Sequence, residues 1–258
     1  MLEFCVVFGV GPTFQSVIVL SAAGGCVQIR VPDPEVRYIA FGDSATSNGS
    51  MRPYPDILAD RLGEPSEAIA NEGESGESTE EGLTRLEALL SNEIFPNAEV
   101  LLYWEGGNDI TEFIKAHDPF LLLSPDDPDY PFADALTQRL DEAQGNIESA
   151  IVTASNAGLD VYVATYYFLR EEVGECDPLP LDLLLPPQAQ RANAYLLRLN
   201  QRIREAVVNQ EAILVDVGAE NEVIGADPDN YVDCNHLSER GNSIVAELFF
   251  EAITASTD

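Results

Sequence analysis

The sequence predicts a three-layer α/β/α sandwich in which about five parallel strands lie between two layers of helices. Two observations predict this fold. Short apolar runs alternate along the chain with longer amphipathic stretches, and the apolar runs are continuous, as in strands buried on both faces. The 258 residues suffice for one full hydrophobic core, and no break in composition indicates a second domain. We expect this domain to span residues 36–254.

The order of the elements follows from these patterns. The apolar runs are the expected strands: Arg37–Phe41, Ala68–Asn71, Glu99–Trp104, Asp160–Tyr166 and Ala212–Val217. The amphipathic stretches, with apolar residues at helical spacing, are the expected helices: Tyr54–Leu62, Thr79–Leu90, Ala133–Ala157, Gln188–Val208 and Ser238–Ile253. Ser78 or Thr79, together with Glu81, predicts a capped start for the second of these helices.

Two long connections rich in proline and aspartate, 117–132 and 170–187, follow predicted strands. They therefore leave the sheet at its carboxyl edge, where open α/β sheets bind their ligands. We interpret their apolar runs as walls or a lid of a ligand pocket. The alternative is that these apolar residues pack back onto the domain.

The charge of the chain restricts its partners. Acidic residues outnumber basic ones by 45 to 13, which gives a formal net charge of −32. This charge argues against nucleic acid and anionic membrane surfaces, and it leaves neutral substrates unaffected. Lys115 is the only lysine. The composition is typical either of a salt-adapted protein or of an acidic protein from an arginine-biased genome.

The N-terminal segment resembles an export signal. Residues 4–25 are largely apolar and end in small residues directly before Cys26. We therefore expect residues 1–26 to direct export, with Cys26 as the lipidated start of the mature protein and the only membrane anchor. The protein would then be periplasmic, extracellular or lipid-anchored. The alternatives are a first strand or an incorrectly assigned start codon.

Three polar clusters carry the residue types of nucleophilic catalysis. Gly42-Asp43-Ser44 directly follows the first predicted strand, where a turn presents a hydroxyl to a substrate. Gly106-Gly107-Asn108-Asp109 follows the third strand, and Asp233-Cys234-Asn235-His236 lies near the C-terminus. A carboxylate three residues before a histidine can orient its imidazole as a general base. The other histidine, His117, lies in an expected loop and has no such arrangement.

These clusters resemble the conserved blocks of the SGNH hydrolases, also called GDSL esterases and lipases. The resemblance covers about residues 36–254 and implies a flavodoxin-like strand order. It implies Ser44 as nucleophile, His236 as base and Asp233 as the residue that orients the base. It also implies an oxyanion hole made by the Ser44 N–H, the Gly76 N–H and the Asn108 amide, with Gly73 as an alternative to Gly76.

The resemblance implies a serine esterase that hydrolyses a neutral O-acyl ester, such as a short-chain, acetylated-carbohydrate or lipid ester. The alternatives are an acyltransferase or thioesterase, or a non-catalytic glycan-binding module. No cofactor or metal is expected, and we expect a monomer. Ala45 departs from the larger aliphatic residue usual in the family, and Trp104 and Glu105 are expected near the pocket, where they would affect substrate choice.

Cys176 and Cys234 both fall in segments expected at the carboxyl edge of the sheet. In an oxidising compartment they could pair, which would fix the long loop to the histidine-bearing segment. We therefore predict a Cys176–Cys234 disulfide, with two buried free thiols as the alternative.

Overall fold

The computed structural model describes residues 16–20, 26–47, 51–171, 174–175 and 183–256. Its central sheet has five parallel strands in the order β4-β3-β5-β6-β9, which is the 2-1-3-4-5 order of flavodoxin-like folds. The strands are β3 (Tyr38–Gly42), β4 (Ile69–Gly73), β5 (Val100–Trp104), β6 (Asp160–Ala164) and β9 (Ile213–Val215). The predicted fold class is confirmed.

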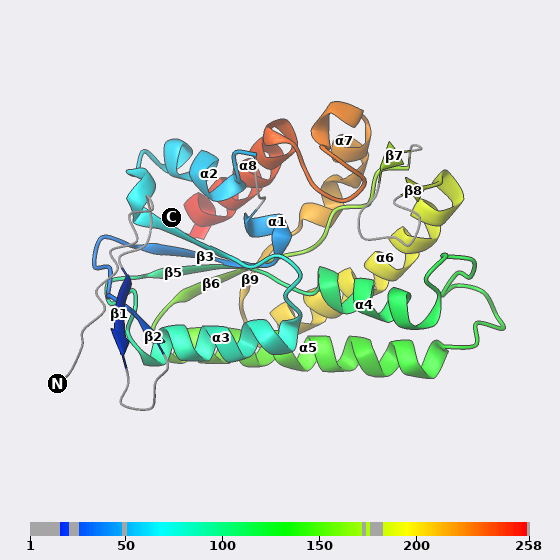
Figure 1. Ribbon diagram of the computed structural model, residues 1–258. Coiled ribbons are helices and arrows are strands. Elements are labelled where there is room, and N and C mark those ends of the chain that lie inside the picture. Colours follow the sequence, from blue (N-terminus) through cyan, green and yellow to red (C-terminus); the bar gives the residue numbers. More distant parts are fainter. Residues whose placement is uncertain (1–15, 21–25, 48–50, 172–173, 176–182, 257–258) are drawn as a thin grey trace.

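Helices cover both faces of this sheet (Figure 1). On one face lie α2 (Tyr54–Leu62) and α8 (Glu239–Ser256), which pack against each other. On the other face α5 (Ala133–Asn156) packs between α3 (Thr79–Ser91) and α6 (Pro186–Asn209). The shorter elements are α1 (Ser44–Ser47), η1 (Ser66–Ala68), η2 (Val217–Glu220), α7 (Asn221–Gly225) and η3 (Pro228–Asn230).

The central strands are continuous apolar runs because both of their faces are covered. Every residue of β3 and β5 is buried, and Ile39, Leu101 and Leu102 are fully enclosed. An aromatic cluster fills the layer above the sheet: the ring of Tyr54 stacks on Phe249 at 4.8 Å and meets Trp104 edge-on at 5.7 Å. This packing joins α2 and α8 to β5, the strand that precedes Gly106-Gly107-Asn108-Asp109.

Local signals set the helix ends. Ser78 caps α3, and its N–H and hydroxyl both donate to the Glu81 carboxylate, at 3.0 and 2.9 Å. The capped start that the sequence predicted is therefore confirmed. After α2, Gly63 adopts a φ of +71°, which lets its N–H reach the last carbonyls of the helix.

One helix differs from the expectation. Residues Gly107–His117 form α4, so His117 is the last residue of a helix and not part of a loop. Ile110, Phe113 and Ile114 are buried at helical spacing, and they pack α4 onto α5 and α6. No helix was among those predicted for this stretch, and the buried packing of its apolar face stabilises one.

Among the residues that the structure describes, four short strands lie outside the central sheet. Ser16–Leu20 (β1) pairs antiparallel with Cys26–Arg30 (β2), and Gly174–Glu175 (β7) pairs with Leu183–Leu184 (β8). Most of the predicted export segment lies outside the described residues, so its removal and the lipidation of Cys26 stay predictions. Within the described part of the chain, no helix combines the length and apolar character needed to cross a membrane.

Candidate active site

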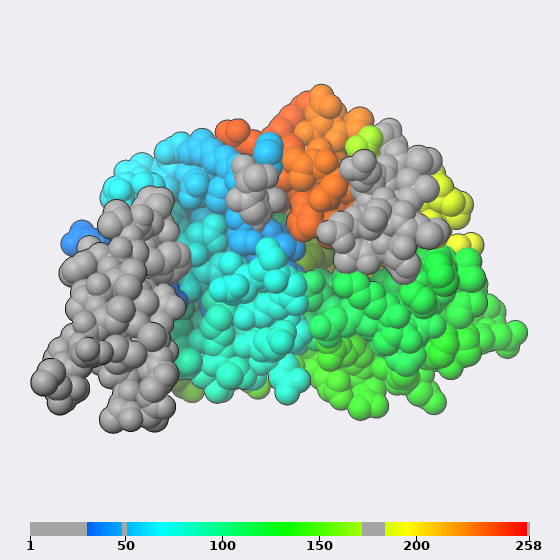
Figure 2. Space-filling view, in the orientation of Figure 1, coloured from blue at the N-terminus to red at the C-terminus, as the bar shows by residue number. Residues whose placement is uncertain are grey.

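Ser44 lies two residues after the end of β3 and is the first residue of α1, at the carboxyl edge of the sheet. The Asp43 carbonyl accepts the N–H groups of Thr46 and Ser47, each at 3.1 Å, which closes the turn. Gly42 is required here, because a Cβ would lie 2.3 Å from the carbonyl oxygen of Trp104. In Figure 2 the blue atoms of this turn lie near the middle of the face, between the cyan surface of α3 and the orange surface around α7.

A chain of two hydrogen bonds joins Ser44 to a carboxylate. Nε2 of His236 lies 3.1 Å from Oγ of Ser44, and Nδ1 of His236 lies 2.7 Å from Oδ2 of Asp233. An ionised carboxylate accepts only, so Nδ1 carries the ring proton and Nε2 is left to accept from the serine. The structure therefore brings together the three residues that the sequence singled out.

Asp233 is held by its own turn as well as by the imidazole. Its Oδ1 accepts the N–H of Asn235 at 2.9 Å and the N–H of His236 at 2.7 Å. Burial on its own would raise the pKa of Asp233, but the hydrogen bonds from His236 and Asn235 and the nearby imidazole lower the pKa below its ordinary value. Asp233 is therefore ionised at neutral pH and keeps the imidazole oriented.

Asn108 lies at the start of α4, on the same edge of the sheet. Its Nδ2 donates to the Glu77 carbonyl at 3.0 Å and, more weakly, to Oδ2 of Asp43 at 3.4 Å. Asn108 is partly exposed. The amide is thus tethered by one good hydrogen bond, while its second N–H is held only loosely.

Gly76 and Gly73 were the two candidates for a backbone donor. Gly73 is an unsuitable donor, because its N–H is engaged by Oδ1 of Asn71 at 3.1 Å. Gly76 is exposed, and no described residue accepts its N–H. Its φ of +86° strongly favours glycine. The geometry therefore favours Gly76.

Asp43, beneath the nucleophile, is only 2% exposed. Its Oδ1 accepts the Ala45 N–H at 2.8 Å, and its Oδ2 accepts the hydroxyl of Tyr166 at 2.7 Å. Burial raises the pKa of Asp43 to about 6, although these hydrogen bonds oppose the rise. Sequence reasoning gave Tyr166 no role, since no local pattern connects residues that are 123 positions apart.

Trp104 and Glu105 are not on an open pocket wall, so the expectation that they affect substrate choice directly is not supported. They are 0% and 1% exposed, because the buried β5 strand ends there. Neither carboxylate oxygen of Glu105 has a hydrogen-bond partner among the described residues. Burial, followed by the nearby charge of Asp43, raises the pKa of Glu105 well above its ordinary value. Glu105 therefore keeps its proton to a higher pH than an exposed glutamate does.

The other candidate histidine is a packing residue. The ring of His117 lies 4.5 Å from that of Phe113 and 4.9 Å from that of Phe132. No described contact joins His117 to Ser44. His236 is thus the histidine that the structure pairs with Ser44.

In the two long connections, 117–132 and 170–187, some apolar residues pack onto the domain and others are exposed. Leu121 and Leu184 are buried in the core, whereas Phe120, Leu122 and Leu185 are exposed. The Gln188 amide donates to the Phe120 carbonyl at 2.8 Å, which fixes the first connection to the start of α6. Whether the exposed side chains contact a ligand stays a prediction.

Cys234 lies in the turn between Asp233 and His236 and is buried. It is disulfide-bonded. Cys176, its predicted partner, lies outside the described residues, so the pairing itself stays a prediction. A disulfide at this position adds a covalent restraint to the turn that orients the imidazole.

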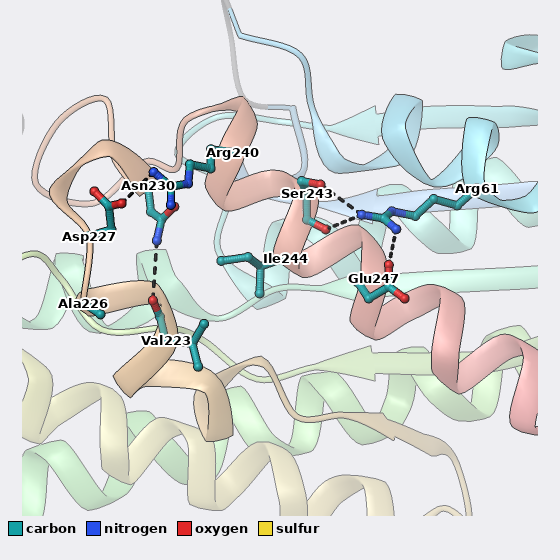
Figure 3. Close-up of a pocket in the computed structure, with 9 residues that line it drawn as sticks. All are labelled: Arg61, Val223, Ala226, Asp227, Asn230, Arg240, Ser243, Ile244 and Glu247. Carbon is teal, nitrogen blue, oxygen red and sulfur yellow. Dashed lines mark hydrogen bonds and ion pairs between the residues drawn. The ribbon is translucent and has the colours of Figure 1, made fainter.

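A surface cavity of about 680 Å³ lies elsewhere, between α7, η3 and α8. Figure 3 shows that its two arginines are already paired, Arg61 with Ser243 and Glu247 and Arg240 with Asp227. No residue of the Ser44 site lines it. Among the described residues, no three acidic, cysteine or histidine side chains are arranged to hold a metal ion.

A sequence model of the GDSL-like lipase/acylhydrolase family matches residues 38–249 of this chain. The chain belongs to this family. The match starts at β3 and ends within α8, so it includes every element that carries the site. A comparison with curated protein sequences gave no significant match.

Solved structures of lipases and esterases share the fold. A GDSL-like lipase from Bacteroides thetaiotaomicron is 19% identical, with a TM-score of 0.55 over 86% of this chain and 89% of the other. An acetyl xylan esterase is 19% identical, with a TM-score of 0.56 over 84% and 100%. A lipase/acylhydrolase from Enterococcus faecalis is 17% identical, with a TM-score of 0.56 over 86% and 96%.

Proposed function

We propose that this GDSL hydrolase is a serine esterase that cleaves a neutral O-acyl ester through an acyl-enzyme on Ser44. The observation that carries the proposal is the chain of hydrogen bonds from Ser44 through His236 to Asp233, with distances of 3.1 and 2.7 Å. A hydroxyl, a base and a carboxylate that orients the base are the parts that serine acyl transfer requires.

In the first half-reaction, Nε2 of His236 accepts the proton of the Ser44 hydroxyl while Oγ attacks the acyl carbon. The carbonyl oxygen becomes an oxyanion as the new C–O bond forms. Asp233 stabilises the imidazolium without taking its proton. When the intermediate collapses, the bond to the alcohol breaks, and the alcohol oxygen receives the proton from Nε2.

In the second half-reaction, His236 accepts a proton from water, whose oxygen attacks the acyl carbon bound to Ser44. Collapse of this intermediate breaks the Ser44 ester and returns the proton to Oγ. The acid leaves, and the enzyme is restored.

The oxyanion would be held by three donors: the N–H of Ser44, the N–H of Gly76 and the Asn108 amide. No described residue accepts a hydrogen bond from either backbone N–H. Asn108 can release its long, 3.4 Å contact with Asp43 while its 3.0 Å bond to the Glu77 carbonyl is kept. Donors that are fixed before the reaction commonly contribute about 3–4 kcal/mol each to the transition state.

The charge of −32 favours a neutral substrate, since an anion would approach against the field of the whole protein. The structural neighbours include an acetyl xylan esterase and an acetyl-xylooligosaccharide esterase. An acetylated carbohydrate therefore belongs among the candidate substrates, beside simple short-chain and lipid esters.

The test is hydrolysis of p-nitrophenyl esters from acetate to palmitate, and of acetylated xylooligosaccharides, by the wild type and Ser44→Ala. We expect turnover by the wild type and its loss in the variant, with a chain-length optimum that identifies the acyl group. Preferential transfer to an added alcohol, or preference for a CoA thioester, would contradict simple ester hydrolysis and favour the transferase or thioesterase.

A further inference from the structure

One carboxylate oxygen of Asp43 is close to two hydrogen-bond donors, the Tyr166 hydroxyl and the Asn108 amide. Oδ2 of Asp43 accepts the Tyr166 hydroxyl at 2.7 Å, and the same oxygen lies 3.4 Å from Nδ2 of Asn108. The other N–H of Asn108 donates to the Glu77 carbonyl. Both contacts to this oxygen are present together, and Tyr166 makes the shorter one.

We propose that Tyr166 is a positioning residue for the oxyanion hole, because its hydroxyl satisfies Asp43 and so leaves one N–H of Asn108 available to the oxyanion. The proposal rests on the proposed function, in which Asn108 is an oxyanion donor. It adds a buried residue that acts on Asn108 through Asp43 and has no described hydrogen bond to Ser44.

Tyr166 affects Asn108 because a buried carboxylate needs hydrogen-bond donors from the protein. Asp43 is 2% exposed, so its oxygens depend on protein donors. Without the Tyr166 hydroxyl, the Asn108 amide would be the remaining donor recorded for Oδ2. Hydrogen bonds to a charged oxygen are short and strong, so at a pH above the pKa of Asp43 the Asn108 amide would move from 3.4 Å toward closer contact. Both of its N–H groups would then be occupied in the resting enzyme.

Tyr166 is well fixed for this task. Asn200 accepts its backbone N–H at 2.7 Å and donates to its carbonyl at 2.6 Å. Its ring lies 5.7 Å from that of Trp104, and a Cβ on Gly107 would lie 2.8 Å from its Cε1. The ring is thus clamped against the glycine that precedes Asn108. A phenylalanine keeps these ring contacts and removes only the hydroxyl.

The first test is Tyr166→Phe. We expect kcat to fall about tenfold with KM nearly unchanged, because the loss affects a donor that acts mainly in the transition state. The matched control is Tyr195→Phe, which removes another buried phenol, hydrogen-bonded to Tyr130 at 2.9 Å. This control should lose stability comparably and keep kcat. An unchanged kcat in Tyr166→Phe would overturn the proposal.

The second test separates positioning from general structural damage. In an Asn108→Ala background, Tyr166→Phe should have no further effect on kcat, since the residue through which it acts is gone. The same tenfold fall in both backgrounds would overturn the proposal while leaving Asn108 as an oxyanion donor. If Asn108→Ala itself kept kcat, this proposal and the oxyanion assignment under the proposed function would both fail.

Should Tyr166→Phe not fold, 3-fluorotyrosine at this position gives a second measurement. Its hydroxyl is a slightly stronger donor of nearly the same size, so it should hold Asp43 more firmly. We expect kcat to rise by about twofold. A lower or unchanged kcat in a folded, fluorinated enzyme would contradict the proposal.

Discussion

The hydroxyl of Ser44 and the imidazole of His236 lie 3.1 Å apart, although 192 positions separate them in the chain. Parallel strands make this possible, because the turns after β3 and β9 both leave the sheet at its carboxyl edge. Asp233 then needs no long-range contact, since it lies three residues before His236 in one turn.

Replacement of Asp233 by asparagine tests the role of that turn. The amide would keep the shape but could donate to Nδ1, which stabilises the tautomer with its proton on Nε2. We expect kcat for ester hydrolysis to fall by about 10⁴-fold, as for comparable changes in other serine hydrolases. Steady-state kinetics with p-nitrophenyl acetate measures this fall.

The matched control is Asp126→Asn, which removes an exposed carboxylate paired with Arg198 at 3.0 Å. Its kcat should equal that of the wild type. A fall of less than tenfold in Asp233→Asn would mean that His236 is oriented by something other than this carboxylate.

Gly76 gives a test of the backbone donor. Gly76→Ala forces a side chain into a backbone with φ of +86°, so the loop should turn away and move its N–H. We expect kcat to fall about tenfold, with a loss of stability of about 1 kcal/mol. Kinetics and urea unfolding of the same preparation separate the two effects.

Gly158→Ala is a close control for backbone strain. Gly158 has a φ of +89°, and like Gly76 it has no atom within 4 Å of a built Cβ. It precedes β6, at the opposite edge of the sheet from Ser44. The control should lose similar stability and keep kcat. Equal kinetics for the two variants would remove Gly76 from the oxyanion hole.

The raised pKa of Glu105 predicts that the stability of the folded protein depends on pH. Its pKa is raised in the folded protein, so the folded state holds a proton that the unfolded state releases above about pH 4.5. The stability that protonated Glu105 contributes is therefore complete below this pH and is lost as the pH rises through the raised pKa. The glutamine of Glu105→Gln does not ionise, so the variant lacks this pH-dependent loss of stability.

We therefore expect Glu105→Gln to melt a few degrees above the wild type at pH 8, with the difference vanishing near pH 4. Thermal unfolding across this pH range measures it. A difference that is constant with pH would show that the Glu105 carboxyl has the same pKa in the folded and unfolded states.

Salt should stabilise the protein. Arginine–carboxylate pairs on the surface weaken with salt, but exposed pairs contribute only about 0–1 kcal/mol each. Salt also screens the repulsion among the acidic residues that give the net charge of −32, since the Debye length falls from about 10 Å at 0.1 M to about 3 Å at 1 M. We expect the melting temperature to rise by about 5 °C between 0.1 and 1 M KCl. A fall would mean that the ion pairs dominate.

The sequence predicted the elements whose signals are local. Strands such as β3 and β5 are continuous apolar runs because helices cover both faces. The Asp233–His236 pair was predictable because both residues share one turn. The start of α3 was predictable because Ser78 and Glu81 satisfy each other.

The missed features depend on contacts between distant segments. Tyr166 meets Asp43 only after β3 and β6 are placed in one sheet with β5 between them. Glu105 is polar, and only the packing around the end of β5 shows that it is buried. In α4 the helical spacing of Ile110, Phe113 and Ile114 is present in the sequence, but no helix was predicted there.

The most direct test of the account is to trap the acyl-enzyme. The wild type is mixed with p-nitrophenyl acetate, quenched in acid within milliseconds, and examined by intact mass and peptide mapping. We expect one added acetyl group, on the peptide and side chain of Ser44, and none in Ser44→Ala. Rapid ester turnover that persists in Ser44→Ala, or an acetyl group on another residue in the burst, would contradict the central claim.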